Sequence, residues 1–240
     1  MTKKRLIAGS LTALLAGLVT AVLLVPTWRT IAFGIARGEK TYRFKPTSYW
    51  TTLLTDRELA DSTIVALTRD GTRAVPVLMQ ALQDPDAHKR AAAADALGQI
   101  GNHAVPALIV ALDHPDVVVR IGAARALHRM GPEGKEAIPR LREATKDEVL
   151  LVGLMAVAAL GRMGKDAVPS LVEVLPDHRD RTLHLDVLNA LARIGPEATS
   201  AVPALLQALR KPGEDDYYQQ ILSTIRKIDP KAAAKATNAQ

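Results

Sequence analysis

Six of the chain's 14 prolines recur at intervals of 30 to 34 residues, and this periodicity constrains the fold more than any other feature. A second residue type, glycine, recurs with the same period. A glycine follows each of the first five of these prolines after 25 or 26 residues, and Asp229 takes that place after the sixth. Two independent marks in phase over six units predict an array of similar units, each packing mainly on its neighbours. The prolines are Pro46, Pro76, Pro106, Pro139, Pro169 and Pro203, and the glycines are Gly71, Gly101, Gly131, Gly164 and Gly195.

Each unit has the pattern of two helices joined by a polar turn. In the last five units the first helix opens with Ala-Val-Pro or Ala-Ile-Pro, and the first unit is degenerate, as expected of a terminal cap. Proline suits a first helical turn because its missing N–H has no partner there. Apolar residues then recur at helical spacing, as in residues 78–82, until Asp84-Pro85-Asp86 ends the helix. The second helix is rich in alanine, as in residues 90–97, and the closing glycine suits a helix C-cap.

No aromatic residue occurs between Thr51 and Asp216, so this stretch must build its core from aliphatic side chains. Small side chains allow helices to pack closely, which favours a dense stack of helix pairs. The same composition disfavours β-sandwiches and barrels and sites built on stacked aromatic rings. The chain has no cysteine, which excludes disulfides, thiolate metal sites and a cysteine nucleophile.

These motifs resemble HEAT-like repeats of the short, phycobilisome-lyase type. The resemblance rests on the Ala-Val-Pro-x-Leu opening, the Asp-Pro-Asp turn, the Arg-x-x-Ala-Ala-x-Ala-Leu second helix and the Ile/Met-Gly end, over residues 46–229. It implies an all-α fold, an armadillo-like α-solenoid (α-α superhelix) of about six two-helix repeats. It also implies a non-catalytic scaffold for protein–protein interaction, with an accessory subunit of an enzyme system resembling chromophore lyases as the alternative.

The N-terminal segment predicts a membrane anchor. After a basic tail, residues 1–5, an uncharged apolar run is long enough as a helix to cross the ~30 Å core of a bilayer, so we expect a transmembrane signal-anchor helix at 6–26. Residues 27–45 would form a basic juxtamembrane linker. The competing interpretation is a cleaved signal peptide, although the apolar stretch of such peptides usually spans only about 7–15 residues.

The expected localisation is a single-pass membrane protein with its repeat domain on the extracytoplasmic side. The three cations of the N-terminal tail favour this orientation, whereas five cations within residues 29–45 favour the reverse. A stripe of small residues could pair two anchor helices, or it could reflect only how common such residues are in anchors. The stripe consists of Gly9, Ala13, Gly17 and Ala21.

The distribution of charge argues against a nucleic-acid partner. Residues 1–45 hold eight basic residues and one acidic residue, whereas residues 46–240 hold 23 basic and 24 acidic residues. The repeat region is therefore close to neutral, and it lacks both the positive field and the aromatic rings that nucleic-acid surfaces normally use.

One basic column recurs two residues before the closing mark of each unit except the second. Stacking would align these side chains into a stripe that binds a protein partner with an acidic segment. The alternative is structural, since a cation near a helix C-terminus gains about 0.3–1 kcal/mol from the macrodipole. The stripe consists of Arg69, Arg129, Arg162, Arg193 and Lys227.

A second column is expected to be structural, a hydrogen-bonded ladder between neighbouring turns made by Asp86 with Arg90 and Asp116 with Arg120. The six histidines occupy different repeat positions and fit ordinary surface residues. No catalytic, phosphate-binding or metal-binding motif occurs, so the sequence predicts no catalytic site, no metal and no cofactor. The tail, residues 230–240, is expected to be flexible.

Overall fold

The structure is a computed structural model that describes residues 26–56, 58–175, 181–210 and 215–238. The chain divides into two compact units, Met1–Ala93 and Ala94–Gln240, and the helix α6 (Ala87–Ile100) contains the boundary. The predicted repeat of helix pairs is confirmed in both units.

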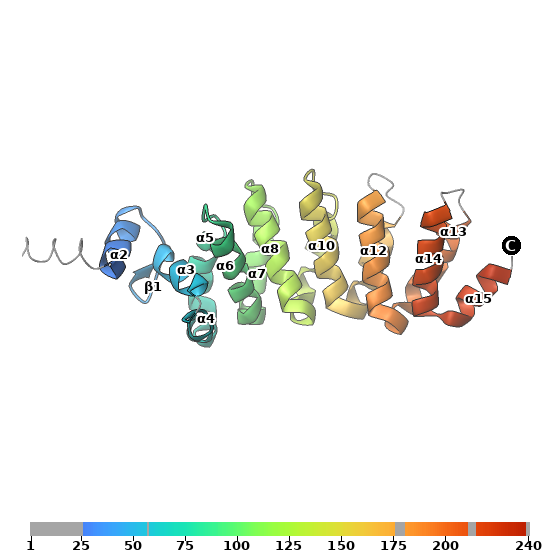
Figure 1. The fold of residues 1–240 in the computed structure, drawn as a ribbon, viewed down its shortest axis with the longest axis horizontal. Coiled ribbons are helices and arrows are strands. Elements are labelled where there is room, and N and C mark those ends of the chain that lie inside the picture. The colour runs from blue at the N-terminus through green and yellow to red at the C-terminus, as the bar shows by residue number, and fades with distance from the viewer. Residues whose placement is uncertain (1–25, 57, 176–180, 211–214, 239–240) are drawn as a thin grey trace, which may run out of the picture. The chain divides into compact units, whose positions relative to one another are not determined.

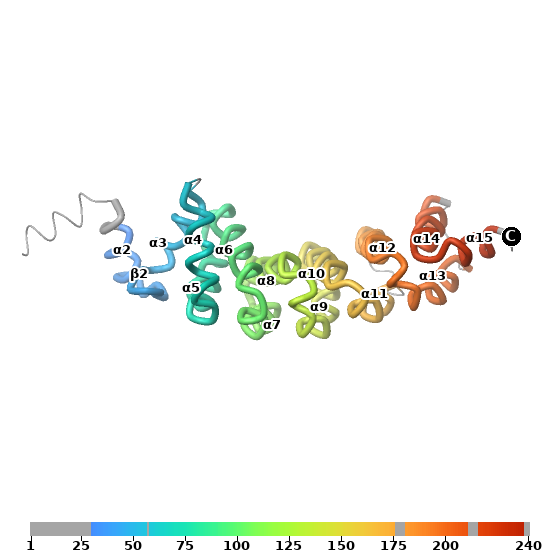
Figure 2. The backbone as a smooth tube through the Cα atoms, turned by 90° about the horizontal axis from the view of Figure 1, so that it is seen from below, coloured from blue at the N-terminus to red at the C-terminus, as the bar shows by residue number. Residues whose placement is uncertain are grey.

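The C-terminal unit consists of two layers of helices (Figures 1 and 2). The second helices of successive repeats pack on one another in one layer, α8 on α10, α10 on α12 and α12 on α14, and the shorter first helices form the other layer. These elements are α7 (Val105–Ala111), α8 (Val117–Met130), α9 (Ile138–Ala144), α10 (Leu150–Met163), α11 (Val168–Val174), α12 (Arg181–Ile194), α13 (Val202–Leu209), α14 (Asp215–Ile228) and α15 (Pro230–Asn238).

Each long helix passes into the next repeat through a short 3₁₀ segment. The closing glycines at this junction have positive φ, 65° at Gly131 and 75° at Gly164, with ψ of −134° and −146°, a backbone region that is open essentially to glycine alone. The 3₁₀ segments are Gly71–Arg73, Gly101–Ala104, Gly131–Ala137, Gly164–Ala167 and Gly195–Ala201.

The core between the two layers is aliphatic. Its largest fully buried side chains in the C-terminal unit are all leucines, and alanines with no exposed surface fill the space between the helices. Burial of a leucine contributes roughly 1.5–3 kcal/mol, and alanine allows the second helices to approach closely. The leucines are Leu97, Leu108, Leu127, Leu141, Leu160, Leu171, Leu188, Leu191 and Leu205.

The N-terminal unit begins with a structure that is not a repeat. A helix and a two-stranded antiparallel hairpin precede and pack on α3, and Trp50 of α3 donates a hydrogen bond from Nε1 to the carbonyl of Tyr42 at 3.0 Å. Residues 27–45, expected to be a linker, are thus mostly folded. The elements are α2 (Pro26–Ala36), β1 (Thr41–Tyr42), β2 (Lys45–Pro46), α3 (Thr47–Thr55), α4 (Ala60–Arg69) and α5 (Val75–Ala81).

The predicted membrane localisation is corrected by the structure. Among the residues that it describes, no helix is both long and apolar enough to cross a membrane. The helix α2 has 11 residues, and at 1.5 Å per residue it spans about half of the ~30 Å that a bilayer core requires. Residues 6–25 of the expected anchor, and with them the small-residue stripe, lie outside the described residues.

The C-terminal tail also differs from the expectation of flexibility. Residues 230–238 form α15, and the carboxylate of Asp229 caps its first turn by accepting hydrogen bonds from the backbone N–H groups of Lys231 and Ala232 at 2.9 and 3.1 Å. Ala233 is buried, so the helix packs on the last repeat. An aspartate in place of the closing glycine therefore begins a further helix.

Candidate binding surface

The predicted basic column lies at the C-terminal ends of the second helices. Arg69 ends α4 in the N-terminal unit, and the other four members belong to the C-terminal unit, one on each of α8, α10, α12 and α14. All are exposed. We call the four residues of the C-terminal unit, Arg129, Arg162, Arg193 and Lys227, the basic row.

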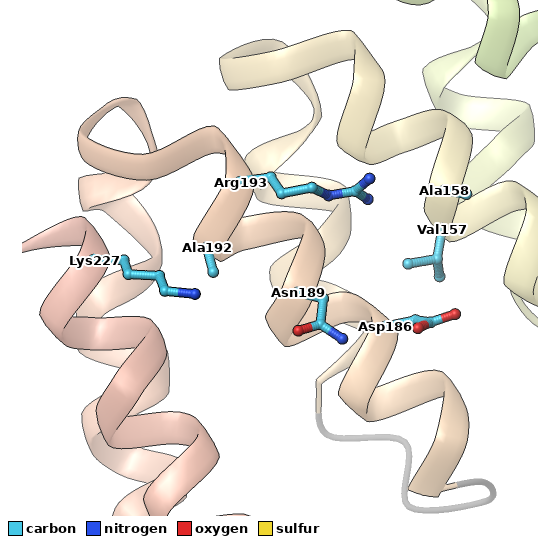
Figure 3. A pocket seen from close by; sticks show the side chains of 7 residues that line it. All are labelled: Val157, Ala158, Asp186, Asn189, Ala192, Arg193 and Lys227. Carbon is cyan, nitrogen blue, oxygen red and sulfur yellow. The ribbon is translucent and has the colours of Figure 1, made fainter.

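Three side chains of the basic row, those of Arg129, Arg193 and Lys227, lie over the preceding second helix. A Cβ built on Gly98 of α6 would lie 2.7 Å from Cβ of Arg129, and one built on Gly161 of α10 would lie 3.2 Å from Nη2 of Arg193. Figure 3 shows Arg193 extending from α12 towards α10, and Lys227 extending from α14 towards Ala192 of α12. Gly98, Gly161 and Ala192 share one repeat position, so a small residue there leaves room for each overlying cation.

The basic row has little counter-charge. In the described part of the chain, no carboxylate oxygen lies within 4.0 Å of the charged nitrogens of these four residues. The helix ends do not depend on these side chains for capping. At the end of α8, for example, the N–H of Gly131 bonds to the carbonyl of Leu127. The cations are therefore open to solvent and to a ligand.

A pocket of about 450 Å³ opens between α10, α12 and α14 beside the last two cations of the row (Figure 3). Apolar side chains from α10 and α12 form part of its wall, and Asn189 accepts a hydrogen bond from Gln220 Nε2 at 3.3 Å. The pocket thus combines a small apolar surface with polar groups of both charges. Its lining residues are Val157, Ala158, Asp186, Asn189, Ala192, Arg193 and Lys227.

The predicted ladder has different partners from those that the spacing suggested. Asp116 caps α8 by accepting from the N–H of Val118 at 2.9 Å, and Asp86 accepts in the same way from the N–H of His88 at 2.8 Å. This hydrogen bond from His88 is the largest cause of the lowered pKa of Asp86. Both carboxylates are therefore engaged at their own helix starts.

The two arginines of the ladder bind turn carbonyls. Arg90 donates from Nη1 to the carbonyls of Asp84 and Pro85, each at 2.8 Å. Arg120 donates equivalently to its own turn, and its remaining nitrogens bind the carboxylate of Asp147 in the next turn at 2.8 and 3.0 Å. This hydrogen bonding raises the pKa of Arg120 further above its usual value. A bond between neighbouring turns is present at Arg120, with Asp147 in place of Asp116.

Comparison with known proteins identifies the repeats. The HEAT repeat family matches residues 50–110, 75–152 and 105–192, which together cover more than half of the 240 residues. The chain belongs to the HEAT repeat family. No curated protein matches it, and the finer resemblance to phycobilisome-lyase repeats stays a prediction.

Solved structures similar to this HEAT-repeat chain include engineered repeat proteins. A designed armadillo repeat protein in complex with the peptide (KR)4 has 16% identity and a TM-score of 0.46, over 75% of this chain and 98% of that chain. A computationally designed armadillo repeat protein for modular peptide recognition has 18% identity and a TM-score of 0.43, over 78% of this chain and 98% of that chain.

One of the six histidines expected to be ordinary surface residues, His128, is partly buried. His128 of α8 stands at the repeat position that holds glycine or alanine at 98, 161 and 192, and it is half-buried. Its pKa is lowered, first by burial and then by the positive charges of Arg162, Arg193, Arg125 and Arg129. The only signal in the sequence was the exchange of a small residue for histidine within this one column.

The HEAT repeats show no metal-binding cluster in the residues that the structure describes, where no three histidine, aspartate or glutamate side chains converge. The basic row presents exposed guanidinium and ammonium groups beside small apolar patches. Such groups bind anions through charge-assisted hydrogen bonds.

Proposed function

We propose that this HEAT-repeat protein is a non-catalytic scaffold that binds an acidic, extended segment of a partner protein along the basic row. The repeat solenoid is a fold typical of protein-interaction scaffolds. The observation that carries the proposal is the basic row itself, four exposed cations on successive helices without an acidic partner in the described residues.

The spacing of the helices specifies the pattern of the partner. Packed helices lie about 8–10 Å apart, and an extended chain advances about 3.3 Å per residue. An acidic side chain at every third position of an extended segment would therefore meet one cation on each successive helix. The pocket beside Arg193 and Lys227 supplies a recess in which the partly exposed Ala158 and Ala192 can pack against the apolar part of such a side chain.

Fluorescence anisotropy with a labelled twelve-residue peptide carrying glutamate at every third position tests this proposal. The double charge reversal R162E/R193E should weaken binding at least tenfold, ~1.4 kcal/mol, and the affinity of the wild type should fall as salt is added. The matched control is K146E/R210E, which makes the same change of charge at exposed residues that follow first helices. Equal affinities of the two variants would refute the proposal.

A rearranged peptide provides a second control. It keeps the composition of the first peptide but gathers its glutamates in one block. Because the cations lie on separate helices, the block can meet fewer of them, and we expect weaker binding to the wild type. Equal binding of both peptides would show a general attraction of acidic chains without the alignment proposed here.

A further inference from the structure

One helix of the C-terminal unit is apolar on its solvent side as well as on its core side. Residues 150–161 of α10 include no charged or polar side chain. A helix that is apolar all round is normally buried, yet Leu150 and Leu151 are 42% and 48% exposed. The outer side of α10 therefore leaves apolar surface open to water.

The open apolar residues of α10 share one helix face. Leu151, Leu154, Met155 and Ala158 follow one another at the spacing that aligns side chains on one side of an α-helix. Leu151 is exposed and the other three are partly exposed, whereas the residues between them are buried. The face that the spacing predicts is thus the face that solvent reaches.

The apolar surface continues onto α8, which packs on α10 (Figure 1). Val118 and Ile121 of α8 hold the same repeat positions as Leu151 and Leu154 of α10, and both are partly exposed. The open side chains of these two helices therefore form one surface. We call it the apolar patch, and it consists of Val118, Ile121, Leu151, Leu154 and Met155.

The apolar patch is a local feature of the array. At the repeat positions of Leu151 and Met155, α12 carries Thr182 and Asp186, and α14 carries two further polar residues, Asp216 and Gln220. The fold therefore does not require apolar side chains at these positions. Their presence on α8 and α10 indicates a contact that is specific to this part of the surface.

Cations border the apolar patch on one side. Arg125 lies seven residues after Val118 on α8, and Arg162 lies seven residues after Met155 on α10, about two turns along the same helix faces. Arg162 has no carboxylate oxygen within 4.0 Å among the residues that the structure describes. The surface is thus complementary to a partner that combines apolar side chains with negative charge.

The same charges disfavour a second copy of this chain as the occupant. Residues 46–240 hold 23 basic and 24 acidic residues, so the repeat region is close to neutral. Pairing of two copies would bring no net negative charge to the cations beside the patch, whereas an acidic partner segment would.

We propose that the apolar patch binds an apolar anchor that flanks the acidic segment of the partner protein. The inference rests on the proposed function, because it adds a second element to the segment that the basic row receives. Arg129 is the first cation of the basic row, so a chain that continues from it towards the patch extends one end of the acidic segment. The eight residues from Ile121 to Arg129 span about 12 Å along α8, which an extended chain covers in about four residues.

The test extends the acidic twelve-residue peptide by a four-residue serine linker and an anchor, Leu-Ser-Leu. Alternate side chains of an extended chain point the same way, so both leucines can face the patch. One peptide carries the anchor before the acidic segment and another carries it after, and each has a control that ends in Ser-Ser-Ser. By fluorescence anisotropy, one anchored peptide should bind the wild type at least tenfold more tightly than its serine control.

Substitution of the patch should remove this gain. V118S/L151S changes the same repeat position on α8 and α10, and it should bind the anchored peptide and its serine control about equally. The matched control V65S/V110S replaces two exposed apolar residues outside the patch, 65% and 73% exposed, and should keep the gain. Thermal unfolding followed by circular dichroism checks that both variants fold. Because the gain is apolar, it should persist when added salt weakens the binding of every peptide.

The outcomes separate this inference from the proposed function. If no anchored peptide binds more tightly than its serine control, or if V118S/L151S keeps the gain, the anchor site is refuted while the acidic-segment function stands. If the gain is present but R162E/R193E changes no affinity, the acidic-segment function is refuted while the patch stands as an apolar site. If the wild type sediments as a dimer and V118S/L151S as a monomer, the patch is an interface between two copies, and the anchor site is overturned.

Discussion

Arg120 of α8 binds Asp147 of the next repeat through two parallel hydrogen bonds, Nε to Oδ2 at 2.8 Å and Nη2 to Oδ1 at 3.0 Å. The same guanidinium donates from Nη1 to the carbonyls of His114 and Pro115 in its own turn, and Asp147 also accepts from the N–H of Val149 at the start of α10. One buried side chain therefore joins two adjacent turns. In a solenoid, such contacts between neighbours carry the cooperativity of folding.

Replacement of Arg120 by alanine should lower the free energy of unfolding by roughly 3 kcal/mol, because it leaves the carboxylate of Asp147 and two carbonyls without their donor. Both side chains of the pair are only about 10% exposed. Urea unfolding followed by circular dichroism measures the loss. R142A is the control, since it removes a more exposed pair with Glu173 and should cost about 0.5 kcal/mol. Equal losses would contradict a special role for Arg120.

A charge placed between the helix layers should unfold the C-terminal unit. Leu127 has no exposed surface, and L127D would bury a carboxylate among alanine and leucine side chains without a partner. The penalty of several kcal/mol is comparable to the whole stability of a domain, about 5–15 kcal/mol. Thermal unfolding followed by circular dichroism should lose its cooperative transition. The control V110D changes a residue that is 73% exposed and should melt like the wild type.

The repeat array could be predicted from the sequence because its two marks have a direct physical meaning. Proline at the start of a first helix and glycine at a helix end with positive φ are local requirements, so their positions delimit the helices before any tertiary contact is known. The α2 helix and the hairpin before α3 could not be predicted in this way. They occur once, and they depend on contacts such as Tyr42 with Trp50 that no period reveals.

The polar contacts also fall into two groups, those that the repeat period predicts and those that depend on how the helices pack. The column of cations at the helix ends could be read from the period, but the lean of Arg193 over Gly161 depends on the packing of α12 against α10. Sequence spacing suggested that Arg120 would pair with Asp116, four residues away. Its partner Asp147 lies 27 residues away, because Asp116 is needed as the cap of α8 and stacking brings the next turn closer.

The N-terminal unit should lose stability in acid through Asp70. Hydrogen bonds from the Tyr42 hydroxyl and then from the Arg43 guanidinium, the latter at 2.6 Å, hold the pKa of Asp70 below its usual value. A carboxylate with a lowered pKa in the folded state stabilises fully above its unfolded pKa, about 3.9, and that stabilisation disappears as the pH falls through the lowered value.

The variant D70N should therefore be less stable than the wild type at pH 7, and the difference should vanish at the acid end of the titration. Urea unfolding followed by tryptophan fluorescence measures this, because both tryptophans, Trp28 and Trp50, belong to the N-terminal unit. The control E58Q removes an exposed carboxylate and should leave the pH dependence unchanged. A constant difference between D70N and the wild type at all pH values would exclude titration of Asp70 as the cause.

The hairpin turn should gain stability from glycine at position 44. Arg43 and Phe44 form the two-residue turn between β1 and β2, and their φ angles are 49° and 60°. Such turns favour Asn-Gly because both residues adopt left-handed angles, which cost other residues roughly 1–2 kcal/mol. The Phe44 side chain is 92% exposed, so its removal loses little packing, whereas Arg43 must be kept for its ion pair with Asp70.

F44G should accordingly raise the urea midpoint of the N-terminal unit, by an amount equivalent to about 0.5–1 kcal/mol once the added freedom of glycine in the unfolded chain is counted. The matched control is F44A, which removes the same ring but keeps a Cβ at the left-handed position. Tryptophan fluorescence follows both transitions, since the Trp50 ring lies 5.1 Å from that of Tyr42 at the base of the hairpin. An equal gain in F44A would attribute the effect to loss of the exposed ring, and a loss in F44G would show that the backbone at this turn is not strained.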